Sequence, residues 1–148
     1  MVSIGDVAKR VNSQNFKVYI STSDSDEFTL MQNASLNMSH SEFREATTSG
    51  SVVYYSGLPD NTLSGTILYS TDFGNTNSAN ALEDWMTTTN GEYATKNIRV
   101  KLTGADATTT VFQFTSLAKL TSCTVYKGQE GAVKADITFI LAGNPVIS

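Results

Sequence analysis

The most constraining feature of this sequence is the segment 133–141, in which apolar and mostly polar residues alternate. A period of two places successive side chains on opposite faces of a strand, so this pattern predicts a strand with one buried face. We expect the core to receive the apolar set, Val133, Ala135, Ile137, Phe139 and Leu141. We expect the opposite face of this closing strand to carry Lys134, Asp136, Thr138 and Ile140. The outward Ile140 predicts that this face is covered, either by the helix expected at 79–88 or by a neighbour.

Further strands are predicted upstream, where β-branched and aromatic residues recur between turn signals. They cover 16–20, 28–36, 52–55, 63–71, 98–103, 110–117 and 120–126. The turn 127–131 joins the last of these to 133–141, so this hairpin is the most secure local unit. A chain of strands and turns is typical of a mainly β protein, folded as an antiparallel β-sandwich or β-barrel.

One α-helix is expected to interrupt the strands, at 79–88. Leu82, Trp85 and Met86 fall at i, i+3 and i+4, which gives a narrow apolar stripe for packing on the sheet. The predicted fold is therefore an antiparallel sandwich or barrel with one flanking α-helix.

The whole chain, 1–148, is expected to form a single domain, because 148 residues suit one hydrophobic core. An N-terminal arm, 1–14, precedes the first strand. The polar segment 39–61 shows little periodicity outside 52–55 and is expected to be a long inter-strand loop. Ordered loops of this length are usually functional or contact a partner.

The charge balance bears on possible partners. The formal net charge is −4 and the sequence pI is about 4.8, which argues against a protein that grips DNA through its phosphates. The densest basic group is Lys96, Arg99 and Lys101, expected to be the solvated face of a strand. Only 16% of residues are charged, and a protein that covers much of its surface with copies of itself needs few charges.

A search for catalytic chemistry finds no constellation of the required residue types. His40 is the one histidine, and although Ser39 and Ser41 flank it, neither a nucleophile elbow nor a third triad member is present. One histidine and Cys123 do not make a usual zinc set. The acidic segment 24–27 lacks calcium-loop spacing and is expected to be a turn. We therefore expect a protein that is not an enzyme and has no catalytic residues, metal site or cofactor.

Targeting signals are not expected either. Residues 1–6 lack the basic start and apolar run of a secretory signal, and no window approaches the length of a membrane span. A single cysteine fits folding in a reducing cytoplasm.

Two segments resemble the tail tube proteins (major tail proteins) of long-tailed bacteriophages. They are REATTSG at 44–50 and YSGLPDNTLSGTI at 55–67. In that family the first type of segment opens a long hairpin loop and the second returns the chain to the barrel. The resemblance extends over roughly residues 28–145 and includes the helix and the closing strand.

The resemblance implies a subunit with a two-sheet β-barrel and a flanking helix, six of which form a ring. The inner sheets of the ring join into one lumenal barrel, and rings stack through the long loop and the chain termini. The acidic balance fits a bore whose wall repels phosphate. The residues expected to make contacts between rings are Arg44, Glu45, Thr47, Thr48, Tyr54, Tyr55 and Leu58.

The function so implied is that of a structural subunit of a hollow tail tube, through which DNA passes during ejection. Implied partners are other copies of the chain, tape measure and tail terminator proteins, and transiting DNA without specific binding. The implied location is the virion tail, assembled in the cytoplasm of the bacterial host. Two alternatives remain: a related tube-forming protein of a secretion or contractile system, and a ligand-binding β-sandwich.

Overall fold

The computed structural model describes residues 5–29, 31–69, 95–129 and 131–148. These residues are mainly β, with one short 3-10 helix, η1 (Val7–Lys9). The strands are β1 (Val11–Tyr19), β2 (Met31–Ala46), β3 (Val52–Leu68), β4 (Thr95–Gly104), β5 (Thr109–Lys127), β6 (Val133–Leu141) and β7 (Val146–Ile147). The predicted helix at 79–88, with Leu82, Trp85 and Met86, lies outside the described residues.

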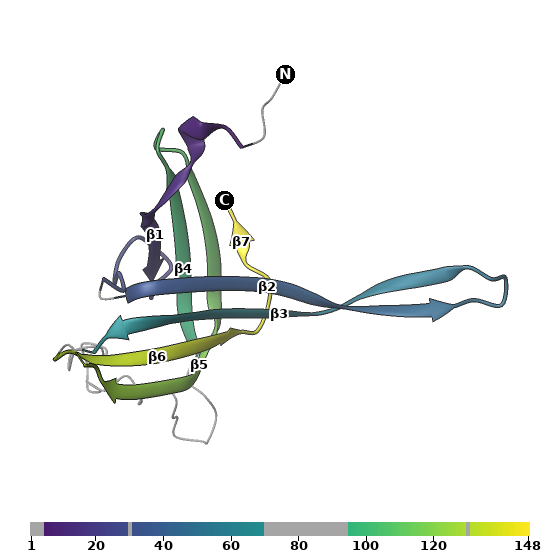
Figure 1. Cartoon of the computed structure of the whole chain (residues 1–148). Coiled ribbons are helices and arrows are strands. Elements are labelled where there is room, and N and C mark those ends of the chain that lie inside the picture. The colour runs from purple at the N-terminus through teal and green to yellow at the C-terminus, as the bar shows by residue number, and fades with distance from the viewer. Residues whose placement is uncertain (1–4, 30, 70–94, 130) are drawn as a thin grey trace.

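The described strands form one antiparallel sheet in the order β1-β4-β5-β6-β3-β2, with β7 paired to the start of β5. The long strand β5 is shared: its first part pairs with β4 and its second part with β6 (Figure 1). Ser116, with φ 55°, lies just before this change of partner. Because non-glycine residues rarely adopt positive φ, Ser116 marks a local irregularity within the strand. The sequence predicted two strands here, 110–117 and 120–126, but one bent strand spans both.

The bend divides the sheet into two halves that run crosswise (Figure 1). We call β2, β3, β6 and the end of β5 the long half, and β1, β4, the start of β5 and β7 the short half. Buried apolar side chains from both halves form one core cluster, which includes Val100 and Phe114 from the short half and Leu63 and Phe139 from the long half.

The predicted alternation on the closing strand agrees with the burial along β6. Ala135, Ile137, Phe139 and Leu141 are buried in the core cluster. Val133 is the exception, because it opens β6 opposite Lys127, beyond the edge of the core, and its side chain is exposed.

The expectation of a long loop at 39–61 was wrong. β2 and β3 pair from Met31↔Ile67 to Ala46↔Val52, so only the turn 47–51 lies between them. The backbone hydrogen bonds of this segment form between β2 and β3. This pairing does not require apolar side chains to alternate along the strands. Polar residues on both faces hid the strands from a period-two search.

Candidate assembly surface

The long hairpin of β2 and β3 extends well beyond the rest of the sheet (Figure 1). β6 pairs with β3 only from Asn61 to Leu68, so the part of β3 before Asn61 has β2 as its sole neighbour among the described strands. A two-stranded ribbon without further packing is marginally stable in water. We call the residues 42–56 the projecting ribbon, and its geometry favours a role in contact with another molecule.

The ribbon and its root carry exposed apolar side chains. Phe43 is 59% exposed, Tyr54 is 58% exposed and Leu58 is 84% exposed. The guanidinium of Arg44 lies over the ring of Tyr54, 5.5 Å from its centre, which is a cation–π contact between directly paired residues. Apolar groups held in water by an ordered scaffold are typical of protein interaction sites.

The root of the ribbon is fixed by a bulge and a buried amide. Between His40↔Pro59 and Glu42↔Ser56 the register shifts, and Gly57 lies in the bulged strand. A Cβ at Gly57 would lie 2.9 Å from the carbonyl oxygen of Ser41, so glycine permits this close approach of the two strands. Asn61 is the one buried polar residue in the described part of the chain.

The tip of the ribbon is a compact turn. The amide of Thr47 donates to the carbonyl oxygen of Ser51, and the Thr47 hydroxyl donates to the same oxygen at 3.1 Å. Gly50, with φ 85°, supplies the left-handed residue that the turn requires. The tip is therefore built locally, with no help from the sheet.

A second surface feature is the polar outer face of the long half. Along the register, Ser35, Ser64, Thr138 and Ser122 lie side by side on four neighbouring strands. The next row is Asn33, Thr66, Asp136 and Thr124, and on the other side lies Asn37, Thr62, Ile140 and Lys119. We call these twelve residues the hydroxyl face. Most of its side chains are short and polar, but it also contains the apolar Ile140 and two charged groups, Lys119 and Asp136.

The carboxylate on the hydroxyl face is hydrogen-bonded. Asp136 Oδ1 accepts from the Thr66 hydroxyl at 2.8 Å. Desolvation, together with the charge of Asp136 and a hydrogen bond to it, raises the pKa of the Tyr126 hydroxyl above its usual value. Lys134 pairs directly with Tyr126 at the same end of the sheet. The positive charge of Lys134 therefore offsets the negative charge of Asp136 at this end of the sheet.

The acidic turn is tied to the short half by ion pairs. Asp24 contacts Arg99 Nε at 2.7 Å through Oδ1 and Lys101 Nζ at 2.6 Å through Oδ2. Hydrogen bonds from Lys101 and then Arg99, with their positive charges, hold the pKa of Asp24 below its usual value, although desolvation opposes them. The sequence predicted a solvated basic strand face, and the structure instead places two of its three cations on this carboxylate.

The structure distributes the predicted contact residues along the ribbon and its root. Arg44 and Glu45 lie in β2, Thr47 and Thr48 in the tip, and Tyr54 and Leu58 in β3. The backbone of Tyr55 pairs with Phe43. On the closing strand, Ile140 is 45% exposed and no described element covers it.

Two residues of this surface were missed by the sequence analysis. Phe43 is a lone aromatic in a polar run, which is itself a signal for an exposed contact. Asn61 lies in a predicted turn, and its burial depends on Gly143, which is distant in sequence, so no local pattern marks it.

Two kinds of feature are absent from the described residues: a metal-binding cluster and a helix that could span a membrane. They contain no cluster of three or more His, Cys, Asp or Glu side chains placed to hold a metal ion. Within the same residues, none of the helices has the length and apolar character to cross a bilayer. His40 lies in the long hairpin opposite Pro59, and the neighbouring Ser39 hydroxyl donates to the carbonyl oxygen of Asp60.

Comparison with known proteins gives similarity in structure but not in sequence. No family model and no curated protein matches the sequence. The chain is similar to a protein in the "anti-feeding prophage cap (AFP tube terminating cap)", with a TM-score of 0.66, 14% identity, and coverage of 100% of this chain and 95% of that one. It is also similar to a protein in the "tail of empty GTA particle", determined with C6 symmetry, with a TM-score of 0.58, 11% identity and coverage of 93% and 98%.

A third similar structure is the "SPP1 tail tube", with a TM-score of 0.58, 18% identity, and coverage of 94% of this chain and 81% of that one. The matches extend over nearly the full length of this chain in each case. The chain therefore has the mainly β fold of proteins of phage tail tubes and related particles, which confirms the resemblance carried by the two short motifs.

Proposed function

We propose that this chain is a structural subunit that assembles into stacked hexameric rings, which form the hollow tail tube of a phage or phage-like particle. The observation that carries the proposal is a four-stranded antiparallel layer with two outer edges, one bare polar face and one projecting ribbon. A sheet edge exposes backbone groups that recruit another chain. The fold shared with proteins of tails and tube caps supports the same assignment.

The strand directions of the long half allow a ring to close. β2, β3, β6 and β5 alternate in direction, so β5 runs antiparallel to β2 at the opposite edge. Placing the β5 edge of one copy beside the β2 edge of the next therefore continues an antiparallel sheet. The outer edges available in the described chain are also of similar length, 31–38 in β2 and 120–127 in β5. Repetition of this heterologous contact gives a closed ring.

The position of the core indicates which face of the long half lines the bore. The short half and the buried cluster lie on one side of the long half, and the hydroxyl face lies on the other. In a closed ring the bulky side is placed outside, because six short halves would otherwise crowd the centre. The hydroxyl face, including Thr138 and Ile140 of the closing strand, then forms the wall of the bore.

The chemistry of this wall suits a conduit for DNA without specific binding. Specific or tight DNA binding needs clustered Lys and Arg against phosphates. The hydroxyl face offers mainly Ser, Thr and Asn side chains instead. It is nearly neutral, so the acidic, phosphate-repelling wall expected from the net charge is replaced by a wall with little electrostatic attraction or repulsion.

The projecting ribbon is assigned to contacts between rings. Its predicted contact residues, Arg44, Glu45, Thr47, Thr48, Tyr54, Tyr55 and Leu58, are joined by Phe43. The part of the predicted N-terminal arm, 1–14, that precedes β1 and the C-terminal strand β7 are assigned supporting roles in stacking, since β1 already begins at Val11. The flanking helix with Leu82, Trp85 and Met86, and closure of the subunit into a sandwich or barrel, remain parts of this proposal.

The proposed partners follow from the tube. They are other copies of the chain, a tape measure protein inside the tube and a tail terminator at its end. The proposed location is the virion tail, assembled in the cytoplasm of a bacterial host. A second candidate is the tube of a contractile injection system, favoured by the TM-score of 0.62 with a protein in the "Extracellular Contractile Injection System, PVC sheath-tube complex". No catalytic role is proposed.

Electron microscopy of the purified protein at high concentration tests the proposal. Rings or tubes with a central hole and sixfold symmetry are the expected result. Monodisperse monomers at every concentration, in the presence and absence of a tape measure protein, would contradict it.

A further inference from the structure

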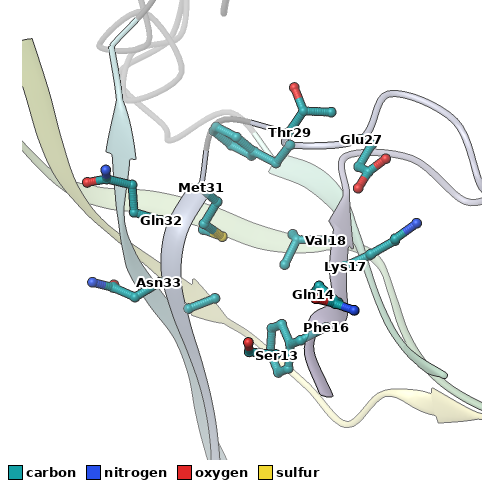
Figure 2. Close-up of a pocket in the computed structure, with 12 residues that line it drawn as sticks. Ser13, Gln14, Phe16, Lys17, Val18, Glu27, Thr29, Met31, Gln32 and Asn33 are labelled. Atoms are coloured by element: carbon teal, nitrogen blue, oxygen red, sulfur yellow. The ribbon is translucent and has the colours of Figure 1, made fainter. Parts of the chain in front are cut away.

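A cleft of about 490 Å³ opens between β1 and β2, the two strands at the ends of the sheet order. Its apolar lining includes Phe16 and Val18 on β1 and Met31 on β2. Figure 2 shows Met31 and Val18 pointing toward one another from opposite sides of the cleft. The rim is polar and includes Gln14, Glu27 and Gln32. The cleft lies apart from the projecting ribbon, and it shares only Asn33 with the hydroxyl face.

The cleft lies beside the edge of β2 that the proposed ring joins to the next copy. Met31 to Ala34, which line one side of it, begin this edge. In an antiparallel junction the start of β2 meets the end of β5 of the neighbouring copy. The residues that arrive next to the cleft are therefore those around Val125 and Lys127.

The end of β5 carries side chains of matching chemistry on the matching side of the sheet. Val125 pairs with Ala135, whose side chain is in the core, so Val125 points to the same side of the sheet as the core and the cleft. It is nevertheless 41% exposed, because the core does not extend that far along β5. Lys127 lies two residues further along the same face of β5. In the proposed junction it comes close to Glu27, which lies at the rim of the neighbouring copy's cleft.

We infer that the cleft between β1 and β2 receives the end of β5 from a second copy of this chain. The neighbouring copy's Val125 packs against Met31 and Val18, and its Lys127 pairs with Glu27. The inference rests on the proposed ring and adds to it a side-chain contact beneath the backbone pairing. A junction made by backbone pairing alone fixes its register weakly, whereas an apolar side chain in a cleft fixes it strongly.

Cysteine cross-linking tests this contact on the assembled full-length chain. In a Cys123→Ser background, one variant carries Met31→Cys and Val125→Cys together, and two others carry each change alone. A short bismaleimide should link the double variant into a ladder that ends at the closed ring. A mixture of the two single variants should give dimers and nothing larger, because the contact joins two different surfaces.

The control pairs Met31→Cys with Val146→Cys, an apolar residue of the short half that is more exposed than Val125 (71% against 41%), and should give no ladder. Charge reversal gives an independent measurement. Glu27→Lys and Lys127→Glu should each lower the yield of rings, and the double reversal should restore it.

The outcomes separate the two proposals. Rings or tubes that form but give no Met31–Val125 cross-link overturn this contact and leave the proposed function intact. The same holds if the double variant Glu27→Lys, Lys127→Glu fails to restore assembly. A chain that stays monomeric in the microscope overturns both.

Discussion

The side-chain amide of Asn61 donates a 2.8 Å hydrogen bond to the carbonyl oxygen of Gly143. The same side chain accepts from the backbone N–H of Ser39 at 3.2 Å, so one buried amide joins β2, β3 and the turn after β6. This junction lies where β3 loses β6 as a neighbour and the long hairpin leaves the sheet. It holds the direction in which the projecting ribbon starts.

Replacing Asn61 by alanine should therefore destabilise the fold. The change leaves the Gly143 carbonyl and the Ser39 amide without their partner in a partly buried setting, at a cost of about 1–3 kcal/mol. Denaturant unfolding monitored by fluorescence measures the effect. The matched control is Asn37→Ala, an exposed amide on the same strand pair, which should change stability by less than about 0.5 kcal/mol. Equal effects of the two changes would contradict a special role for Asn61.

Shortening the projecting ribbon should separate ring formation from elongation. Replacing residues 42–56 by an Asn-Gly turn removes Phe43 and Tyr54 but leaves the paired edges of the long half in place. We expect rings of normal symmetry that do not stack, seen by electron microscopy and sedimentation. The triple change Phe43→Ser, Tyr54→Ser and Leu58→Ser keeps the ribbon length and should weaken stacking in the same direction. Normal tubes from the shortened chain would show that the ribbon does not join rings.

The Asp24 ion pairs predict an acid-dependent loss of stability. The pKa of Asp24 is lowered in the folded state by Lys101 and Arg99, so its contribution is present above the unfolded pKa of about 3.9. It is lost as the pH falls through the lower folded value, because the protonated carboxyl no longer attracts the two cations. Denaturant midpoints of the wild type and Asp24→Asn should differ near neutral pH and converge in acid. A constant difference down to about pH 2 would count against this assignment.

Lysines on the hydroxyl face should convert a passive bore into one that retains DNA. Ser64→Lys and Thr138→Lys add positive charge where the register places two hydroxyls side by side. Tubes with both changes should protect short double-stranded DNA from nuclease at low salt and release it as the salt concentration rises. The control carries Thr110→Lys and Thr115→Lys on the short half. These lysines lie on the outside of the proposed tube, so any DNA that they bind stays accessible to nuclease. Protection by the control alone would place the bore on the other face.

The sequence predicted the elements whose burial is one-sided. The strand at 133–141 matches β6 in both bounds, because Ala135, Ile137 and Phe139 alternate between a core and a solvated face. The hairpin that joins it to the preceding strand is present in the predicted place. Where a strand has one dry face, its period is visible in the sequence.

The rest depended on contacts that local patterns do not encode. Apart from the predicted strand 52–55, the parts of β2 and β3 in the ribbon were missed because the ribbon has no dry face within the single chain. The prediction divided β5 at 118–119, where the strand changes partners from β4 to β6 without ending. The candidate assembly surface was predicted through family resemblance, while the cleft at Met31 and the buried Asn61 required the three-dimensional arrangement.

The alternating directions of the four strands in the long half also limit how such a tube changes its width. Because β2 and β5 run antiparallel at opposite edges, the junction between copies stays antiparallel only if each copy contributes an even number of strands. Adding a single strand would force a parallel seam at every junction, with a different hydrogen-bond pattern. A wider or narrower bore is therefore reached by gaining or losing whole hairpins, or by changing the number of copies in the ring.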